Sequence, residues 1–366
     1  MVFEGKGVRI VLKRRNIGLL CLLTMLLVGL GLYFYMYYPA QTMPIGGPVD
    51  VSTIQPENYH HDCLHPCIRY DESSGKYYMA QSPYYAWDNK VENPIFYSSD
   101  SYMQWTDGHL IAETPETGYN SDPNICLSSD GSIYFIWREC YTPLCDSLKA
   151  HEVTVGGKIV NNFLSKKEVY CINHLPNGDI EQAPVMIEHG GERYIYAAWY
   201  QYEPIRKNKG IAIWKEDVAS ANKGGQTCKC QFVDSIAFES CITVDRVLNI
   251  PLYGHIFYIP KPLYHDLWHF DLFEYANKLY MVSVAEKGDN IMLSVSEDWR
   301  HFKTFHKPLV NNHYTENFCG YRQYYYKPTA FVKDDILHVF YTANAKEDPK
   351  RNQLYHTSLP AKNILK

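Results

Sequence analysis

Five similar segments recur along the chain, and this recurrence limits its fold more than any other feature. Each segment opens with a polar anchor, passes through a turn and continues into an aromatic-rich run. The anchors lie at positions 65, 122, 182, 268 and 327, so they are separated by 57, 60, 86 and 59 residues. An interval of this length holds about four short strands, which is typical of one blade of a β-propeller.

The aromatic runs have the composition of β-strands that follow tight turns. Each comes directly after a turn signal that contains Gly, Asn or Asp. The runs cover residues 76–80, 132–137, 193–197, 278–282 and 336–341. Five such units fill residues 61–366, so we predict an all-β fold: a five-bladed β-propeller with an insertion near residues 220–262. A β-sandwich with coincidental spacing is the alternative.

Composition supports a folded β-protein and excludes several functional classes. Apolar residues make up 46% of the chain and charged residues 20%, so it is neither disordered nor a coiled coil. Many of its 32 tyrosines fall in the aromatic runs, so we expect most of them to be structural. The net charge is −5 and no basic run follows the N-terminus, which argues against a nucleic-acid partner. Walker A, GxGxxG, HExxH and GxSxG motifs are absent from the sequence.

Residues 17–38 carry no charge, are rich in leucine, and are numerous enough to span a bilayer. A basic cluster precedes them, so the positive-inside rule places the N-terminus in the cytoplasm. We therefore predict a cytoplasmic tail (1–16), a transmembrane anchor (17–38), a stem (39–60) and a domain outside the cytoplasm, whether periplasmic, extracellular or lumenal. A cleaved signal peptide is the alternative, but the apolar stretch is long and ends in aromatic residues.

Ten cysteines follow the predicted anchor, and an even number in an exported chain predicts disulfides. Cys63 with Cys67, and Cys140 with Cys145, are close enough in sequence to close small loops. The remaining connectivity stays open.

The first strand of each propeller blade lines the central channel, so the polar residues of the blade openings are expected to converge. Glycoside hydrolysis requires two carboxyl groups across the scissile bond, and histidine can act as an acid or base near neutral pH. The candidate catalytic residues are His65, Asp122, Glu181, His269 and Asp271. The candidate substrate-binding residues are Trp87, Glu92, Gln182, Trp199, Trp268 and Arg322.

The blade openings carry a family resemblance, in the segments His65-Pro66-Cys67-Ile68, Asn93-Pro94-Ile95 with Ser98-Ser99-Asp100, Ser121-Asp122-Pro123-Asn124-Ile125, Gln182-Ala183-Pro184-Val185 and Trp268-His269-Phe270-Asp271. Over residues 65–359 the chain resembles the five-bladed-propeller glycoside hydrolases of families 43, 32, 68 and 117. Family 43 opens its first blade with a general-base Asp, where this chain has His65. It opens its third blade with a general-acid Glu, where this chain has Gln182. Glu181 could replace that acid only if a bulge shifted the strand register.

Together, the predicted anchor and the resemblance imply a membrane-anchored, glycoside hydrolase-like protein that acts on a glycan outside the cytoplasm. One alternative is a carbohydrate-binding propeller without catalysis, which Gln182 favours. A type II glycosyltransferase-like protein also fits the layout, but the Asp-x-Asp motif is absent. No cofactor is required for this reading, although a central divalent cation such as calcium is compatible with it. The predicted partners are a glycan and, through the N-terminal helix, a membrane; the oligomeric state stays open.

Overall fold

The computed structural model describes residues 2–5, 8–11, 14–37, 47–51, 62–145, 150–172, 180–201, 207–217, 228–237, 244–252, 255–262, 267–285, 290–305, 308–311, 325–344, 348 and 350–365. The chain divides into two compact units, Met1–Pro39 and Ala40–Lys366.

The first unit contains one helix and one short hairpin. Strands β1 (Val2–Gly5) and β2 (Val8–Val11) pair antiparallel, and helix α1 covers Arg14–Tyr37. Among the described residues, no helix combines the length and the apolarity that crossing a membrane requires. The predicted transmembrane anchor is therefore not supported.

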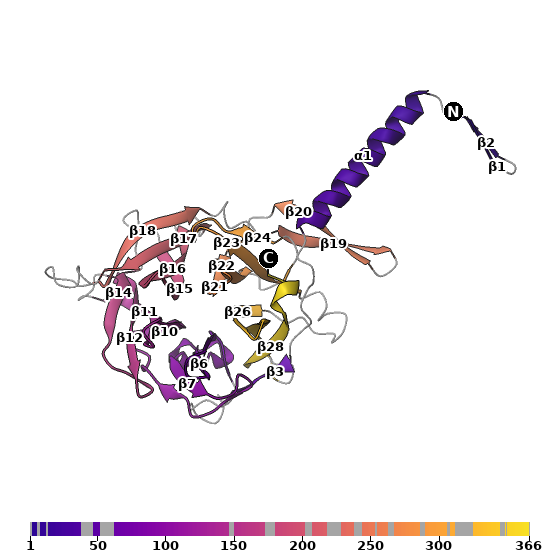
Figure 1. Ribbon diagram of the computed structural model, residues 1–366. Coiled ribbons are helices and arrows are strands. Elements are labelled where there is room, and N and C mark those ends of the chain that lie inside the picture. The colour runs from indigo at the N-terminus through magenta and orange to yellow at the C-terminus, as the bar shows by residue number, and fades with distance from the viewer. Residues whose placement is uncertain are drawn as a thin grey trace. The chain divides into compact units, whose positions relative to one another are not determined.

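The second unit is an all-β, five-bladed propeller, as predicted, and its five sheets surround a central axis (Figure 1). Blade one contains β5 (Cys67–Asp71), β6 (Lys76–Gln81), β7 (Ile95–Ser99) and β9 (His109–Leu110). Blade two contains β10 (Gly118–Leu127), β11 (Ile133–Cys145), β12 (Ala150–Val160), β13 (Phe163–Leu164) and β14 (Glu168–Ile172). Blade three contains β15 (Ile180–His189), β16 (Glu192–Gln201), β17 (Lys207–Glu216) and β18 (Cys230–Ala237).

The last two blades follow the same order. Blade four contains β21 (Leu267–Tyr275), β22 (Lys278–Ala285), β23 (Asn290–Ser296), β24 (Lys303–Thr304) and β25 (Val310–Asn311). Blade five contains β26 (Tyr325–Lys333), β27 (Ile336–Asn344), β28 (Asn352–Pro360) and β3 (Gly47–Pro48). Because β3 precedes blade one in sequence yet pairs with β28, it closes the ring.

Shorter elements complete the unit. Strands β4 (Asp50–Val51) and β8 (Gln104–Trp105) pair in parallel. The hairpin of β19 (Val244–Leu252) and β20 (His255–Pro262) forms a two-stranded sheet of its own within the segment predicted as an insertion. The 3₁₀ helices are η2 (Tyr85–Trp87), η3 (Asn89–Val91) and η6 (Ala361–Asn363).

Local sequence explains the hairpins that connect the first and second strands of blades three, four and five. Both residues of each two-residue turn have positive φ: Gly190-Gly191, Ala276-Asn277 and Asp334-Asp335. This is the backbone of a type I′ turn, whose twist matches that of the flanking strands. The aromatic runs predicted from sequence accordingly form β6, β11, β16, β22 and β27.

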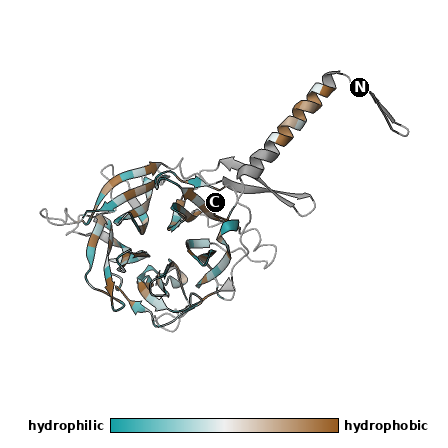
Figure 2. Ribbon diagram, in the orientation of Figure 1, coloured by the Kyte–Doolittle hydropathy of each residue, from teal (hydrophilic) through white to brown (hydrophobic). Residues whose placement is uncertain are grey.

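The apolar core is divided among the seams between neighbouring blades, and hydrophobic residues occur in every blade (Figure 2). Each of the five buried clusters joins two consecutive blades, as Phe273 of β21 and Val339 of β27 do between blades four and five. Several tyrosines are fully buried in these seams, including Tyr97, Tyr200 and Tyr341. These buried rings support a structural role for the high tyrosine content.

Among the described cysteines, neither short-loop pairing that the spacing allows is formed, so the structure does not support the predicted disulfides. Cys63 and Cys67 are both free and buried, and Cys140 is free. Cys63 packs in the seam between blades five and one. The Cys67 sulfur instead accepts hydrogen bonds from Asn124 Nδ2 at 3.2 Å and from the backbone nitrogen of Ile125 at 3.3 Å. These two thiols therefore serve different contacts.

Two histidines of blade five form a stacked pair. His338 of β27 and His356 of β28 lie with ring planes 18° apart, and Nδ1 of His338 is 3.0 Å from Nε2 of His356. Tyr102 and Phe331 pack against them. Burial, followed by the nearby Lys333 ammonium, lowers the pKa of His338 to about 4, even though Asp334 acts in the opposite direction. Burial and the neighbouring imidazole lower the pKa of His356 to about 4.

We expect the protein to lose stability as the pH falls from about 6.5 toward 4. The unfolded chain binds protons at these imidazoles near pH 6.5, whereas the folded chain does not, so acid favours unfolding in this window. His338 is buried and His356 is partly exposed, so we expect each imidazole to contribute on the order of 1–2 kcal/mol to this loss of stability. In His338→Phe, the melting temperatures at pH 5 and pH 7 should differ less than in the wild type. The control His109→Gln, whose ring nitrogen lies 3.2 Å from the uncharged Asn162 amide, should leave that difference unchanged. An unchanged difference in His338→Phe would contradict the assignment.

Candidate metal and catalytic site

Backbone irregularities in the inner strands shape the site at the propeller axis. The register of β10 against β11 shifts between Ser121 and Asn124, and β21 and β26 contain similar shifts near Trp268 and Tyr326. Within the first of these bulges Asp122 has a φ of 54°. Bulges redirect side chains away from the regular alternation of a strand, and they occur often beside active sites.

Three buried side chains converge at this point: His65 before β5, Asp122 of β10 and His269 of β21. Asp122 Oδ1 lies 3.4 Å from His65 Nε2 and 3.3 Å from His269 Nδ1. Each of the three side chains is at most 4% exposed. The structure thus brings together three predicted catalytic residues from blades one, two and four, which we call the axial cluster.

Arg138 and Glu152 hold the Asp122 carboxylate from the opposite side. Arg138 Nε donates to Asp122 Oδ2 at 3.0 Å, and another guanidinium nitrogen donates to Glu152 at 2.9 Å. Oδ2 is thereby occupied, so Oδ1 is the oxygen that faces the imidazoles. Burial alone would raise the pKa of Asp122, but the adjacent His65 and Arg138 hold it well below its usual range.

Glu92 fixes the orientation of His65. Its Oε1 lies 2.8 Å from His65 Nδ1 and accepts a hydrogen bond from the Ser121 hydroxyl at 2.7 Å, while Ser82 Oγ lies 3.1 Å from the same ring nitrogen. A proton on Nδ1 leaves Nε2 free to act as an electron-pair donor toward the cluster. Burial raises the pKa of Glu92 well above its ordinary value, and the nearby Asp122 carboxylate adds to the increase.

Both imidazoles of the axial cluster are neutral at physiological pH. Burial lowers the pKa of His65 to about 3 and that of His269 to about 4, although Asp122 acts in the opposite direction on each. Within the part of the chain that the structure describes, Asp122 Oδ1 and both ring nitrogens of His269 lack hydrogen-bond partners. Buried polar atoms are rarely left in this state, so the geometry favours an additional partner.

A divalent transition metal fits these atoms. One donor atom from each of His65, Asp122 and His269 can be chosen such that all three lie within 4.8 Å of one another. Ligand atoms about 2.0–2.1 Å from a tetrahedral centre lie roughly 3.3–3.4 Å apart, which agrees with the two distances measured from Asp122 Oδ1. Three protein ligands leave one position open, as in catalytic zinc sites. Two imidazole nitrogens favour such a metal over calcium, which prefers all-oxygen ligands.

Two aromatic rings border the axial cluster. Tyr326 lies with its ring centroid 5.3 Å from that of His65 and 4.8 Å from that of His269. Trp268 packs against His269 at 4.7 Å and meets Tyr326 edge-on at 4.6 Å. Both rings are partly exposed. An aromatic corner of this kind can bind the apolar face of a sugar ring.

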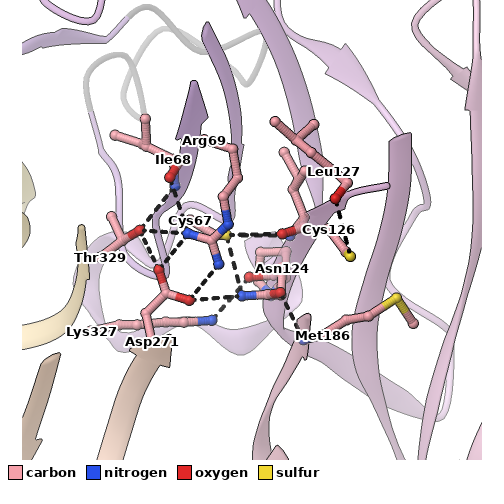
Figure 3. Close-up of polar contacts among 12 residues, drawn as sticks. Cys67, Ile68, Arg69, Asn124, Cys126, Leu127, Met186, Asp271, Lys327 and Thr329 are labelled. Atoms are coloured by element: carbon pink, nitrogen blue, oxygen red, sulfur yellow. Dashed lines mark hydrogen bonds and ion pairs between the residues drawn. The ribbon is translucent and has the colours of Figure 1, made fainter. Parts of the chain in front are cut away.

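Asp271, another predicted catalytic residue, lies in a separate network (Figure 3). Its two oxygens accept hydrogen bonds from two guanidinium nitrogens of Arg69, both at 2.6 Å, and Thr329 Oγ1 donates at 2.5 Å. The carboxylate is completely buried. With Asn124 Nδ2, which donates to Oδ1 at 3.4 Å, protein donors from blades one, two and five occupy Asp271, which thus ties four blades together.

The contacts described for the axial cluster do not include Glu181, Gln182, Trp199, Trp87 or Arg322. Glu181 and Gln182 pair in regular register with β16, and the bulge of β15 begins after Gln182, so it does not move Glu181 into the position of Gln182. Trp199 is half-buried with Lys209 over its ring. Arg322 lies outside the described residues, and so does the side chain of Trp87.

Sequence reasoning missed Arg138, Glu152, Ser82, Ser121 and Tyr326. Tyr326 directly precedes the predicted blade-five anchor at position 327, so the repeat spacing contained a signal for it. Arg138 and Glu152 lie on β11 and β12, and Ser82 lies in the loop after β6, so only the folded structure brings them to the axis. Ser121 lies on β10 directly before Asp122.

Comparisons with known proteins support the fold. No protein-family model and no curated protein matches the sequence. An N-acetylgalactosamine deacetylase from F. plautii, solved with blood group B trisaccharide, superposes with a TM-score of 0.61 at 12% identity, over 87% of this chain and 95% of that one. A thermostable family-43 glycoside hydrolase superposes with a TM-score of 0.53 at 13% identity, over 87% of this chain and 93% of that one. A family-43 β-1,3-galactosidase solved with galactodeoxynojirimycin superposes with a TM-score of 0.52 at 10% identity, over 86% of this chain and 94% of that one. The chain therefore has the propeller fold of these enzymes.

Proposed function

We propose that this chain is a metal-dependent hydrolase that removes the acetyl group from an N-acetylated sugar of a glycan. The observation that carries the proposal is the axial cluster, in which two neutral imidazoles converge on one oxygen of a buried carboxylate. The similarity in fold to a deacetylase of N-acetylgalactosamine supports the proposal that the bond cleaved is the amide bond of an N-acetyl group.

His65, Asp122 and His269 would hold the cation. A bound divalent cation acts as a Lewis acid toward a carbonyl oxygen. Arg138 keeps the carboxylate ionised and directs Oδ1 toward the imidazoles, and Glu92 keeps the His65 Nε2 lone pair directed toward the cluster. Such contacts of a metal ligand's second nitrogen orient the ligand and strengthen it.

Glu92 would also move the proton. Amide hydrolysis adds water across the C–N bond, so acetate and a free amine form and one proton must pass from water to the amine nitrogen. Glu92 is a carboxyl group in contact with the cluster that is not one of the three ligands, and burial raises its pKa well above the ordinary value, as expected of a group that donates a proton. Trp268 and Tyr326 would bind the sugar ring beside it.

A glycoside hydrolase is the second candidate. Glu92 and Asp122 contact opposite nitrogens of the same imidazole, so two carboxyl groups of different pKa lie near one another, as such enzymes require. Both oxygens of Asp122 face protein groups, however, and the side chain is fully buried, so this carboxylate is poorly placed to attack a sugar carbon or activate water. The location outside the cytoplasm stays a prediction.

One assay separates these functions. The full chain, incubated with N-acetylated oligosaccharides, should release acetate without new reducing ends. EDTA should abolish the release, and Zn²⁺, Mn²⁺ or Co²⁺ should restore it. Reducing ends that form in the presence of EDTA, without acetate, would instead establish a glycoside hydrolase. Binding without either product would favour the non-catalytic propeller.

A further inference from the structure

A buried polar network from all five blades lies close to the Asp122 bulge, and we call it the axial hub (Figure 3). Its members come from β5, β10, β15, β21 and β26, so every innermost strand contributes. They are Cys67, Arg69, Asn124, Met186, Asp271, Lys327 and Thr329.

Asn124 connects the hub to three other blades. Its Nδ2 lies 3.2 Å from the Cys67 sulfur and 3.4 Å from Asp271 Oδ1, and its Oδ1 accepts a hydrogen bond from the Met186 backbone at 3.0 Å. Since Asn124 ends the bulge that contains Asp122, these contacts fix one side of the bulge.

Lys327 holds the bulge from blade five. It is completely buried, and its ammonium donates to the carbonyl oxygen of Pro123 at 3.0 Å. Across the described ranges, no carboxylate lies within ion-pair distance of this ammonium. Burying an ammonium group without such a partner costs considerable free energy, so packing alone does not explain a lysine here.

The carbonyl oxygen of Pro123 accepts the hydrogen bond from the Lys327 ammonium. Pro123 directly follows Asp122 and lies inside the register shift, where the ladder between β10 and β11 is interrupted. Proline has no N–H group, so its carbonyl is its one backbone hydrogen-bonding group. The Lys327 contact therefore holds the peptide group between Pro123 and Asn124, one residue beyond Asp122.

We propose that Lys327 is a positioning residue, which holds the bulge so that Asp122 Oδ1 stays between His65 and His269. The inference rests on the proposed function, since it concerns the cation site of the axial cluster. Lys327 acts through the Pro123 carbonyl and does not itself touch the three ligand atoms.

Lys327→Met tests this proposal, because methionine keeps an unbranched side chain and removes the donor. With Co²⁺ as the probe, we expect the affinity of the full-length variant to fall by about 10–100-fold, and its visible absorption spectrum to change. Removing a nearby positive charge would by itself strengthen cation binding, so a weaker affinity cannot come from charge alone. Lys327→Gln, too short to reach Pro123, carries the same expectation if Lys327→Met does not fold.

Thr329→Val is the matched control from the same hub. Thr329 contacts Asp271 and the Ile68 backbone but not the bulge. Its loss should lower the melting temperature while the Co²⁺ affinity of the folded protein stays within about threefold of the wild type.

The outcomes separate the two proposals. If the wild type does not bind Co²⁺, the proposed function fails and this inference fails with it. If the wild type binds and Lys327→Met binds equally well or more tightly, the cation site stands and the role of Lys327 is refuted. Equal losses of affinity in Lys327→Met and Thr329→Val would also refute it, because the effect would then belong to the hub as a whole.

Discussion

Asp122→Asn is expected to lower kcat/KM for acetate release by at least about 10³-fold while the protein stays folded. The substitution removes the negative charge on which both imidazoles converge, and a loss of this size equals about 4 kcal/mol of transition-state stabilisation. Asparagine adopts positive φ readily, so the backbone at φ 54° can remain as it is. Arg138 keeps Glu152 as a partner, which limits the cost in stability.

Asp107→Asn provides a matched control. Asp107 also has positive φ, at 55°, but it is exposed in a loop of blade one. The control should retain both turnover and stability. If Asp122→Asn retained more than about a tenth of wild-type kcat/KM, Asp122 would not be essential to the reaction.

Much of the fold was predictable because it depends on local chemistry repeated five times. Turn residues such as Gly190 and Asn277 supply the positive φ of the hairpins, and aromatic runs supply the second strands. The convergence of His65, Asp122 and His269 was also predictable, because the first strand of every blade lines the same axis. Repetition thus turns short local signals into a global arrangement.

The chemistry of the site was less predictable, because it depends on which protein group occupies each oxygen. Asp122 and Asp271 both lie in blade-opening segments of the sequence repeat. One lies in a bulge beside two imidazoles, whereas Arg69 and Thr329 occupy the other. Neither the bulge nor the Arg69 side chain's reach across the axis has a local sequence signature. The free thiols of Cys63 and Cys67 were also not predictable from sequence. Their spacing does not reveal that the two side chains pack in different seams between blades.

Asp271→Asn is expected to lower the free energy of unfolding by about 3–5 kcal/mol, because it leaves the Arg69 guanidinium without its carboxylate in the interior. The melting temperature should fall by roughly 10 °C. The exposed ion pair of Asp234 with Arg300, at 3.1 Å, supplies the matched control. Asp234→Asn should cost less than about 1 kcal/mol, because solvent already screens that pair.

The same variant decides whether Asp271 belongs to the chemistry. Assayed well below its melting temperature, Asp271→Asn should keep kcat/KM within about tenfold of the wild type, since its carboxylate contacts Arg69, Asn124 and Thr329 and none of the three residues of the axial cluster. Combining Asp271→Leu with Arg69→Met should recover much of the lost stability, because replacing both partners of a buried ion pair with apolar side chains removes the unpaired charge. If Asp271→Asn lost as much turnover as Asp122→Asn, with an unchanged melting temperature, Asp271 would instead be a catalytic residue.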